Sequence, residues 1–438
     1  MNAILLNKPA AQVKDNRDLQ NSISSQLKQK LQAHYKSDLF RSRLKFIANA
    51  DVEQKNKLNF ASNNYLGLAN NPVLINQVQQ LLPQLGLGSG ASNLITGYHH
   101  IHQDLEIEIA KRLNCEQALL FSSGYMANLS ISDVLLNLNP NTIALHDHNN
   151  HASLLDGTRL AGCKLARFKH NDIEHLNLLL NKYNDYQNRF IFTESLFSMD
   201  GDFAPLIDIA SLLTRDLSAP TLSSRPSLAT LGAEPRSIMD SGSACFALDR
   251  NDRNLENTAL VIDHSHGFGL FDIGPRKNSN AVIMGTFGKA IGASGAFVAG
   301  SKLFIESLIQ FARPYIYTTS LSPISAAASL LALRLINRDS SYHEKLFTNI
   351  EYFCKELVKI GITPINNQSP IQPIIIGNSS DCIRAAEYLN KHGIIATAIR
   401  APTVPKNKAR LRITLSTSHS FENIDYLIKI LNNLNLFV

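Results

Sequence analysis

The chain has 438 residues, of which 44% are hydrophobic, so it is long enough to bury a large core and to form two or more domains. Its net charge of +6 is small, and lysine and arginine form no run of five or six residues, which disfavours a nucleic-acid-binding protein. The cysteines are irregularly spaced, and neither a signal peptide nor an apolar run of about 20 residues occurs, so we expect a cytoplasmic protein without disulfides or a membrane span.

The N-terminal part is predicted to form a segment of its own over residues 1–70. Residues 1–20 are polar and mixed, and are expected to form a loose tail. Residues 21–45 carry apolar side chains four positions apart, which is typical of one face of a helix. These side chains are Leu27, Leu31, Tyr35 and Leu39. Residues 59–68 are rich in turn formers and lead out of this segment.

From residue 71 to about 320, short apolar strands alternate with helical patterns. Helical spacing marks residues 101–114, 152–161 and 206–213. Buried strands are expected at Ala118–Ser122, Ile143–Leu145, Phe190–Phe192, Leu260–Ile262, Val282–Met284 and Ala296–Ala299. This alternation predicts an α/β fold, with a mostly parallel sheet covered by helices on both faces. Ligand groups are then expected at the C-terminal ends of the strands.

After about residue 320 the pattern changes to that of a smaller α+β domain, over residues 321–438. Helices are predicted at 324–338, 341–360, 380–392 and 421–435. The strands between them are predicted at Ile371–Ile376, Ile394–Ile399 and Leu411–Leu415.

The alternation of strands and helices is interrupted from about residue 214 to 257. Connections between helices and strands usually take about 2–6 residues, and this one takes roughly forty. Its composition predicts an exposed or partly disordered insertion. Because it enters before a strand begins, we expect it opposite the C-terminal ends of the strands, where it is tolerated and non-catalytic.

Lys289 is the first candidate catalytic residue, at the end of Gly285-Thr286-Phe287-Gly288-Lys289. This run is not a phosphate-binding P-loop, because Ile283 stands where the distal glycine belongs and Ala290 where Ser or Thr belongs. A lysine that attacks a carbonyl must be neutral part of the time, and burial or a nearby cation lowers its pKa. The surrounding glycines let a bulky cofactor approach the backbone.

Two other strand ends offer groups that complement this lysine. Asp263 is suited to pair with a protonated pyridine nitrogen, which keeps the ring an electron sink, and His266 to bond a ring hydroxyl. The backbone amides of Gly124 and Tyr125 begin a helix after a strand, which favours a phosphate site. Each feature alone also fits a solvated lysine, a satisfied aspartate or an ordinary turn. Their joint occurrence at strand ends predicts a pyridoxal-phosphate site.

Three other motifs also suggest binding sites. Arg400 closes a predicted strand and is suited to grip a substrate carboxylate with two hydrogen bonds. The run Gly86–Ala91 matches a dinucleotide fingerprint by its letters, but it follows no strand. Histidines cluster at positions 99, 100 and 102 and at 146, 148 and 151, without matching cysteine or carboxylate ligands, so no metal site is expected.

Several motifs of the chain resemble those of the α-oxoamine synthases, a family of fold-type I pyridoxal-phosphate transferases. The resemblance runs from about residue 25 to the C-terminus, apart from the insertion. The motifs that carry it are Asn63–Gly67, Ser122–Tyr125, His151–Leu154, Phe197–Asp202, Thr286–Lys289 and Thr397–Pro405. It implies a large domain over residues 71–320, with a mostly parallel seven-stranded sheet between helices, and a smaller α+β domain over residues 321–438.

The resemblance also implies roles for single residues. Lys289 would hold the cofactor as an imine and, once freed, remove the substrate's α-proton, while His151 stacks on the ring and Asp263 meets the pyridine nitrogen. The other cofactor contacts would be Gly124, Tyr125, Ser198, His266 and Thr286, with Thr318 and Thr319 reaching the phosphate of the partner subunit's cofactor in a homodimer. The substrate-binding positions would be Arg41, His151, Arg400 and Thr403.

Within the family, the letters around Arg400 and at 371–374 favour the member of biotin biosynthesis that condenses L-alanine with a pimeloyl thioester and releases carbon dioxide. The acyl carrier, coenzyme A or acyl carrier protein, stays open. One alternative is another synthase of the family: 2-amino-3-ketobutyrate ligase, 5-aminolevulinate synthase or serine palmitoyltransferase. Another is a catalytically silent partner subunit, which should lack the lysine. The family usually has an acidic residue and an alanine after the aspartate. Here they are His264 and Ser265, and we expect the chemistry to survive.

Overall fold

The computed structural model describes residues 22–36, 43, 57–213, 244–246, 257–271, 273–275, 280–366 and 368–434. The chain divides into two compact units, residues 1–57 and 58–438. In the first unit, α2 (Ile23–Lys36) confirms the predicted N-terminal helix as far as Lys36. Arg43, inside the predicted range 21–45, is not helical, and Leu39 lies outside the described residues. No helix in the described ranges is both long enough and apolar enough to cross a membrane.

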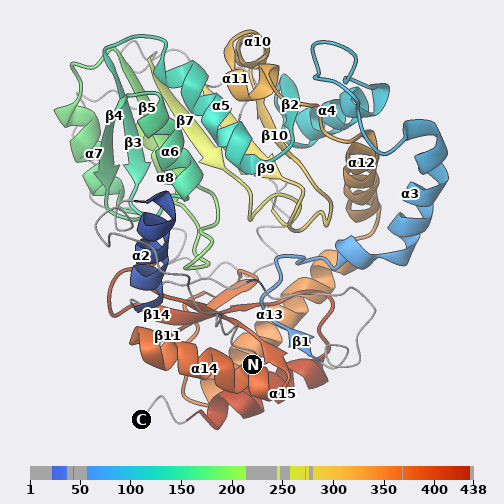
Figure 1. Ribbon diagram of the computed structural model, residues 1–438, viewed down its shortest axis with the longest axis vertical. Helices are drawn as coiled ribbons and strands as arrows, with labels where there is room; N and C mark the ends of the chain where they lie inside the picture. The colour runs from blue at the N-terminus through green and yellow to red at the C-terminus, as the bar shows by residue number, and fades with distance from the viewer. Residues whose placement is uncertain are drawn as a thin grey trace, which may run out of the picture. The chain divides into compact units, whose positions relative to one another are not determined.

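A seven-stranded sheet forms the centre of the second unit (Figure 1). Its strands, in spatial order, are β2 (Gln117–Phe121), β10 (Ala296–Gly300), β9 (Ala281–Thr286), β7 (Thr258–Asp263), β5 (Asn188–Glu194), β3 (Thr142–Asp147) and β4 (Lys164–Phe168). β10 runs antiparallel to both neighbours, and the other pairs are parallel. The predicted mostly parallel sheet is therefore confirmed. β4 was not predicted, because the exposed residues Lys164 and Arg167 interrupt its apolar run at the edge of the sheet.

Successive side chains of the central strands enter two separate hydrophobic clusters, one on each face of the sheet. Ile191 of β5 lies in one cluster, and its neighbours Phe190 and Phe192 lie in the other. The first cluster includes residues of α4 (His100–Arg112), α7 (Ile173–Lys182), α8 (Leu206–Leu213) and α12 (Pro323–Arg338). The second includes residues of α5 (Gly124–Leu136), α6 (Ala152–Leu160) and α10 (Lys302–Phe311). The prediction of helices on both faces is confirmed.

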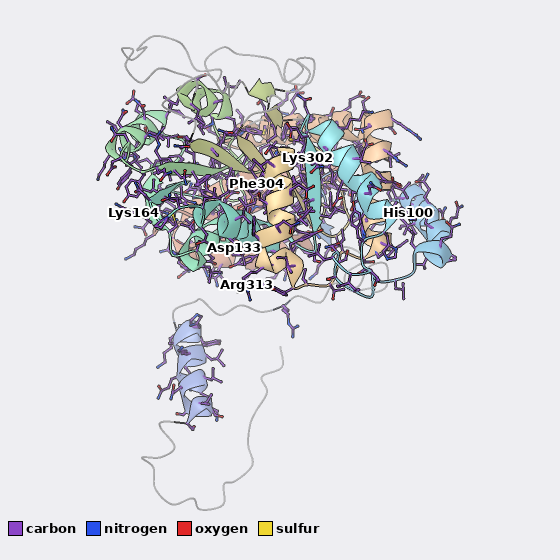
Figure 2. All side chains as sticks on the ribbon, turned by 90° about the horizontal axis from the view of Figure 1, so that it is seen from above. His100, Asp133, Lys164, Lys302, Phe304 and Arg313 are labelled. Carbon is purple, nitrogen blue, oxygen red and sulfur yellow. The ribbon has the colours of Figure 1, made fainter. Side chains whose placement is uncertain are left out.

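Hydrogen bonds at the starts of helices α10 and α11 join them to other parts of the large sheet's surroundings. The backbone N–H of Arg313, at the start of α11 (Arg313–Ile316), donates to Asp133 Oδ2 of α5 at 3.3 Å (Figure 2). The backbone N–H of Lys302 donates to Glu116 Oε2 at 2.7 Å, which joins the start of α10 to the residue before β2.

A three-stranded antiparallel sheet forms the C-terminal layer, with the strand order β11 (Ile371–Gly377), β14 (Ala409–Thr414) and β13 (Thr397–Ile399). The helices α13 (Ser341–Lys359), α14 (Ser379–Lys391) and α15 (Phe421–Asn432) accompany it, as predicted. The predicted strand 394–399 is divided in two. β12 (Ile394–Ile395) pairs with β1 (Leu58–Asn59), and the chain then changes partner at Ala396 before β13. The domain boundaries at 70 and 320 stay predictions, because residues 58–438 form one compact unit.

The predicted insertion lies mostly outside the described residues. Within it, β6 (Ala244–Phe246) is described, and it pairs in parallel with β8 (Ile273–Pro275). The chain leaves α8 at Leu213 and enters β7 at Thr258, the end of β7 opposite Asp263. The insertion therefore begins and ends away from the C-terminal ends of the strands, as predicted, and its dispensability stays a prediction.

Candidate active site

Three neighbouring strands bring acidic and basic groups to one edge of the seven-stranded sheet. The strand register places Glu194 of β5 beside Asp263 of β7, and Asp263 beside Met284 of β9. Lys289 follows three residues after β9 ends. Burial of its amine lowers the pKa of Lys289 to about 8, although the charges of Asp263 and Glu194 oppose this shift. The amine is therefore partly neutral near pH 8, as a nucleophilic lysine requires.

The carboxylate of Asp263 is held in a fixed orientation. Its Oδ2 accepts a hydrogen bond from Asn128 Nδ2 of α5 at 2.9 Å, and its Oδ1 accepts one from the backbone N–H of Ser265 at 3.0 Å. The same Asn128 nitrogen donates to Ser153 Oγ of α6 at 2.8 Å. Two helices and the turn after β7 thus orient a buried carboxylate at a strand end, which is suited to hold a cationic ring nitrogen.

His266 lies in the turn after Asp263. Its Nδ1 hydrogen-bonds to the hydroxyl of Tyr65 at 2.7 Å. Burial, together with the positive charges of Lys289 and Arg412, lowers the pKa of His266 well below its usual value. A neutral imidazole here can bond a ring hydroxyl without adding charge, as its predicted role requires.

His151 begins α6, and its side chain is exposed. Its backbone N–H donates to Glu194 Oε1 at 2.7 Å, and its Nδ1 hydrogen-bonds to Ser153 Oγ at 2.8 Å. Burial, and then the nearby charge of Asp263, raise the pKa of Glu194 well above its usual value. The edge therefore presents an oriented imidazole with an open face, the arrangement that stacking on a planar ring requires.

The predicted anion site is the start of α5. The helix begins at Gly124, and the side chain of its cap, Ser123, accepts a hydrogen bond from the backbone N–H of Met126 at 3.3 Å. The first N–H groups of a helix have no partner within it and attract anions. The hydroxyl of Tyr125 donates to Asp156 Oδ2 of α6 at 2.6 Å, and Ser122 Oγ donates to the carbonyl of Thr319 at 3.4 Å.

The remaining predicted cofactor residues surround this edge. The hydroxyl of Thr286 donates to the carbonyl of Gly295 at 2.9 Å, which closes the turn that carries Lys289. The carbonyl of Ser198 accepts a hydrogen bond from Arg412. Thr318 is half-buried and Thr319 is exposed, and both follow α11.

The structure describes two of the three remaining predicted substrate residues. Arg400 and Thr403 share a turn after β13, where the backbone N–H of Thr403 donates to the carbonyl of Arg400 at 3.0 Å. Arg41 lies outside the described residues. Substrate binding by these three residues stays a prediction.

The structure adds residues that sequence reasoning missed, above all Arg412. Its guanidinium is buried, donates from Nε to the carbonyl of Ser198 at 2.6 Å, and donates from one terminal nitrogen to Asn63 Oδ1 at 3.0 Å. Its charge helps to lower the pKa values of both Lys289 and His266. The signal was an arginine that alternates with apolar residues in the predicted strand, since a buried guanidinium needs several partners.

His264 replaces the family's usual acidic residue, and the structure shows what it contacts. Its Nδ1 hydrogen-bonds to Ser195 Oγ at 2.7 Å, and its Nε2 to the carbonyl of Phe271 at 3.1 Å. A Cβ atom added at Gly267 would lie 2.4 Å from the imidazole of His264, so only glycine leaves room for it. The replacement is therefore a fully bonded packing residue beside Asp263.

Replacing His264 with leucine is expected to lower the free energy of unfolding by about 1–3 kcal/mol, because the buried hydroxyl of Ser195 and the carbonyl of the half-buried Phe271 each lose a partner. Denaturant unfolding measures this loss. His148, an exposed histidine, provides the control through His148→Leu. Equal stability of the two variants would contradict the packing role of His264.

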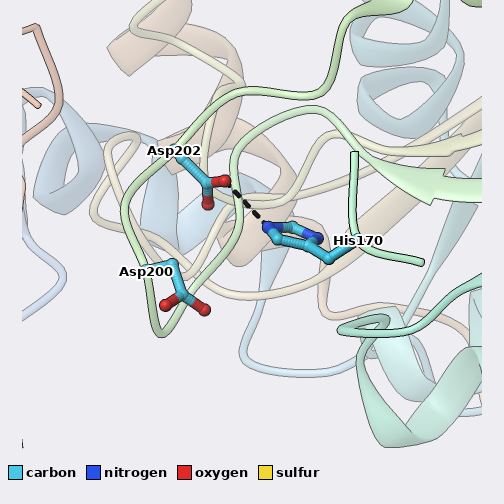
Figure 3. Close-up of side chains that lie close together, drawn as sticks. All are labelled: His170, Asp200 and Asp202. Carbon is cyan, nitrogen blue, oxygen red and sulfur yellow. Dashed lines mark hydrogen bonds and ion pairs between the residues drawn. The ribbon is translucent and has the colours of Figure 1, made fainter. Parts of the chain in front are cut away.

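A separate cluster of His170, Asp200 and Asp202 brings three potential metal-ligand atoms within 4.8 Å of one another (Figure 3). Both ring nitrogens of His170 are already bonded to carboxylates, and Asp200 is paired with Arg410.

The two histidine groups noted in the sequence each contain a buried histidine, His102 in one and His146 in the other. Both are hydrogen-bonded within the protein.

Comparison with known proteins finds relatives along most of the chain. The family model for aminotransferase class I and II matches residues 55–221 and 252–431, and so passes over most of the predicted insertion. A protein of Hahella chejuensis named 8-amino-7-oxononanoate synthase is 39% identical over 93% of this chain and 95% of its own length. One with the same name from Hydrogenovibrio crunogenus is 41% identical over 85% of this chain and 86% of its own.

Solved structures give the same picture of the fold. The crystal structure of 8-amino-7-oxononanoate synthase from Francisella tularensis has a TM-score of 0.66 and 26% identity, over 86% of this chain and 97% of that one. Serine palmitoyltransferase from Sphingomonas wittichii has a TM-score of 0.74 at 21% identity, over 95% of this chain and 98% of that one.

Proposed function

Because the chain belongs to the 8-amino-7-oxononanoate synthases, within the aminotransferase class I and II family, we propose that it joins L-alanine to a pimeloyl thioester with loss of carbon dioxide. The observation that carries this proposal is the buried lysine of lowered pKa beside an oriented aspartate at the ends of β7 and β9. The chain is then an acyltransferase of biotin biosynthesis, with pyridoxal phosphate as its cofactor.

The residues of this edge fit that cofactor. Lys289 is the attachment point, Asp263 meets the pyridine nitrogen, and His151 covers one face of the ring. Ser198 and His266 serve the ring substituents, while Thr286 and the amides of Gly124 and Tyr125 serve the phosphate. When bound, the cofactor draws electrons away from the α-carbon of an attached amino acid.

Lys289 is also the residue best suited to move the substrate's α-proton. Its pKa of about 8 lies near working pH, where a group accepts and returns a proton most effectively. Glu194 Oε1 accepts a hydrogen bond from the backbone N–H of His151 and so fixes this residue at the same edge as Asp263.

The substrate's carboxylate needs a cation close to Lys289, and Arg412 fits this need. It is buried, and its charge affects the pKa of Lys289 directly. A guanidinium held by Ser198 and Asn63 is oriented in advance for a carboxylate. We assign the amino acid's carboxylate, which the sequence predicted for Arg400, to Arg412, and we assign Arg400 and Thr403 to other parts of the substrates.

The active unit is proposed to be a homodimer in the cytoplasm. Apolar side chains are exposed along residues 87–98 and 311–317, among them Leu87 (78% exposed), Ile95 (75%) and Tyr317 (73%). The two segments are linked through Ser320, whose backbone N–H donates to the carbonyl of Ala91 at 3.0 Å. A second copy seated here would bring its cofactor site near Thr318 and Thr319. A monomer mass in solution would contradict this proposal.

Attachment of pyridoxal phosphate to the cofactor-free protein is expected to speed up with pH, by about tenfold per pH unit, until pH 8 and then to level off. The lowered pKa of Lys289 means that its neutral amine appears at lower pH than in an ordinary lysine. Stopped-flow absorbance measures the rate. The control is Nα-acetyl-lysine, whose free side-chain amine has the ordinary pKa. A rate that still rises through pH 10 would contradict the lowered pKa.

Competition among substrates tests the function itself. Turnover is expected with L-alanine and a pimeloyl thioester, and it should be much slower with glycine or serine. Preference for glycine with a short acyl thioester would favour the alternative, a 2-amino-3-ketobutyrate ligase. Parallel assays with pimeloyl-coenzyme A and a pimeloyl carrier protein identify the acyl carrier.

A further inference from the structure

A charged chain of three side chains lies beside the active site but outside the residues assigned to it. His170 follows β4, and it bonds through Nδ1 to Asp147 Oδ1 and through Nε2 to Asp202 Oδ2, each at 2.8 Å (Figure 3). The side chain of Asp147, at the end of β3, is fully buried. The backbone N–H groups of Asn149 and Asn171 also donate to it, at 2.8 and 2.9 Å.

His170 needs a positive charge to make both bonds, because a neutral imidazole has only one N–H to donate. Burial opposes this charge, but the hydrogen bonds to Asp147 and Asp202, and their negative charges, outweigh it and raise the pKa of His170 to about 10. His170 therefore links the end of β3 to the segment that contains Asp202 through two charged hydrogen bonds.

That segment is the loop Phe197–Asp202, which carries the predicted cofactor residue Ser198. The backbone N–H of Phe197 donates to the carbonyl of Asp202, and that of Gly201 donates to the carbonyl of Phe197, both at 2.9 Å. The ring of Phe197 packs perpendicular to the His170 ring, with a centroid distance of 4.5 Å. The loop is thus tied to itself and to His170.

The three-stranded sheet holds the other side of this loop. Arg410 of β14 forms an ion pair with Asp200, and Arg412 of the same strand donates to the carbonyl of Ser198. Gly201 has a positive φ of 70°, and a Cβ atom there would lie 2.2 Å from the carbonyl oxygen of Ile371 in β11. The two sheets therefore meet through this loop in close contact.

We propose that His170 is a positioning residue for the amino-acid substrate: it anchors the loop Phe197–Asp202 to the seven-stranded sheet, and the loop in turn fixes Arg412 relative to Lys289. This inference rests on the proposed function, in which Arg412 holds the substrate's carboxylate. His170 itself touches neither substrate nor cofactor, and it acts through Asp202 and Ser198.

The test is a spectroscopic titration of the cofactor-loaded protein with L-alanine. His170→Gln keeps one amide donor but removes the charge, and it is expected to weaken the affinity for L-alanine about tenfold. Cofactor content should not change, because Lys289 and Asp263 lie outside the loop Phe197–Asp202, and KM should rise more than kcat falls. The matched control is His148→Gln, at the exposed residue directly after Asp147, which should titrate like the unaltered protein.

A double-mutant cycle with Arg412→Lys separates positioning from general loosening. If His170 acts through Arg412, adding His170→Gln to Arg412→Lys should weaken alanine binding by less than about twofold. Full multiplication of the two effects, or an unchanged affinity in His170→Gln alone, would overturn the proposal. Asp202→Asn breaks the same link and replaces His170→Gln in the cycle if that variant does not fold. If the proposed function is wrong, even the unaltered protein will show no spectral response to L-alanine.

Discussion

Replacing Lys289 with alanine is expected to lower kcat by about 10³-fold or more and to abolish the visible absorbance of the lysine-bound cofactor. The lysine has two tasks in the proposed reaction, since it attaches the cofactor and moves the substrate's proton. Both depend on an amine whose pKa is about 8, and alanine supplies none. Steady-state assays and absorbance spectra of the purified variant measure the two effects.

The control for this loss is Lys302→Ala, at an exposed lysine at the start of α10 (Figure 2). It should retain full turnover and absorbance. An unchanged spectrum in Lys289→Ala would mean that the cofactor is attached elsewhere. Normal activity of an assembly containing this variant would favour the silent-subunit alternative.

Replacing Asp263 with asparagine is expected to lower kcat by about 10²–10³-fold while the cofactor remains attached to Lys289. A neutral amide no longer stabilises the proton on the pyridine nitrogen, so the ring withdraws electrons less strongly. Rates of α-proton exchange of L-alanine in deuterated water measure this step directly, without the thioester.

The fold is expected to tolerate this change, which separates chemistry from stability. The amide group of the new asparagine would face Asn128, whose Oδ1 is buried and makes no hydrogen bond within the described part of the chain. Asn128 can rotate its amide so that Oδ1 accepts this hydrogen bond and a second one from Ser153 Oγ. An unfolded variant, or one with unchanged exchange rates, would contradict the role of Asp263.

The sequence predicts a site residue where one short segment contains both a strand or helix end and the reactive group. Asp263 and Gly124 stand where apolar runs stop abruptly, and Lys289 lies among glycines directly after a strand. Glu194 was missed because the strand was predicted to end at Phe192, although β5 continues for two more residues. A strand predicted to end at Glu194 would have shown an acidic residue at its C-terminal end, as β7 does with Asp263.

Arg412 could not be assigned from the sequence, because its partners are distant along the chain. Ser198 is 214 positions away and Asn63 is 349, and only the folded structure brings them to one guanidinium. The split of residues 394–399 into β12 and β13 has the same origin, since the two halves pair with strands from opposite ends of the chain. Long-range pairing of this kind leaves no local pattern.

The most direct test of the central claim is the release of labelled carbon dioxide from carboxyl-labelled L-alanine. The proposed reaction predicts that release requires a pimeloyl thioester and matches the amino ketone formed, one molecule for each. It should disappear in Lys289→Ala. Release without the thioester, or none with either acyl carrier while glycine or serine is consumed, would contradict the assignment of this chain as an alanine-condensing synthase.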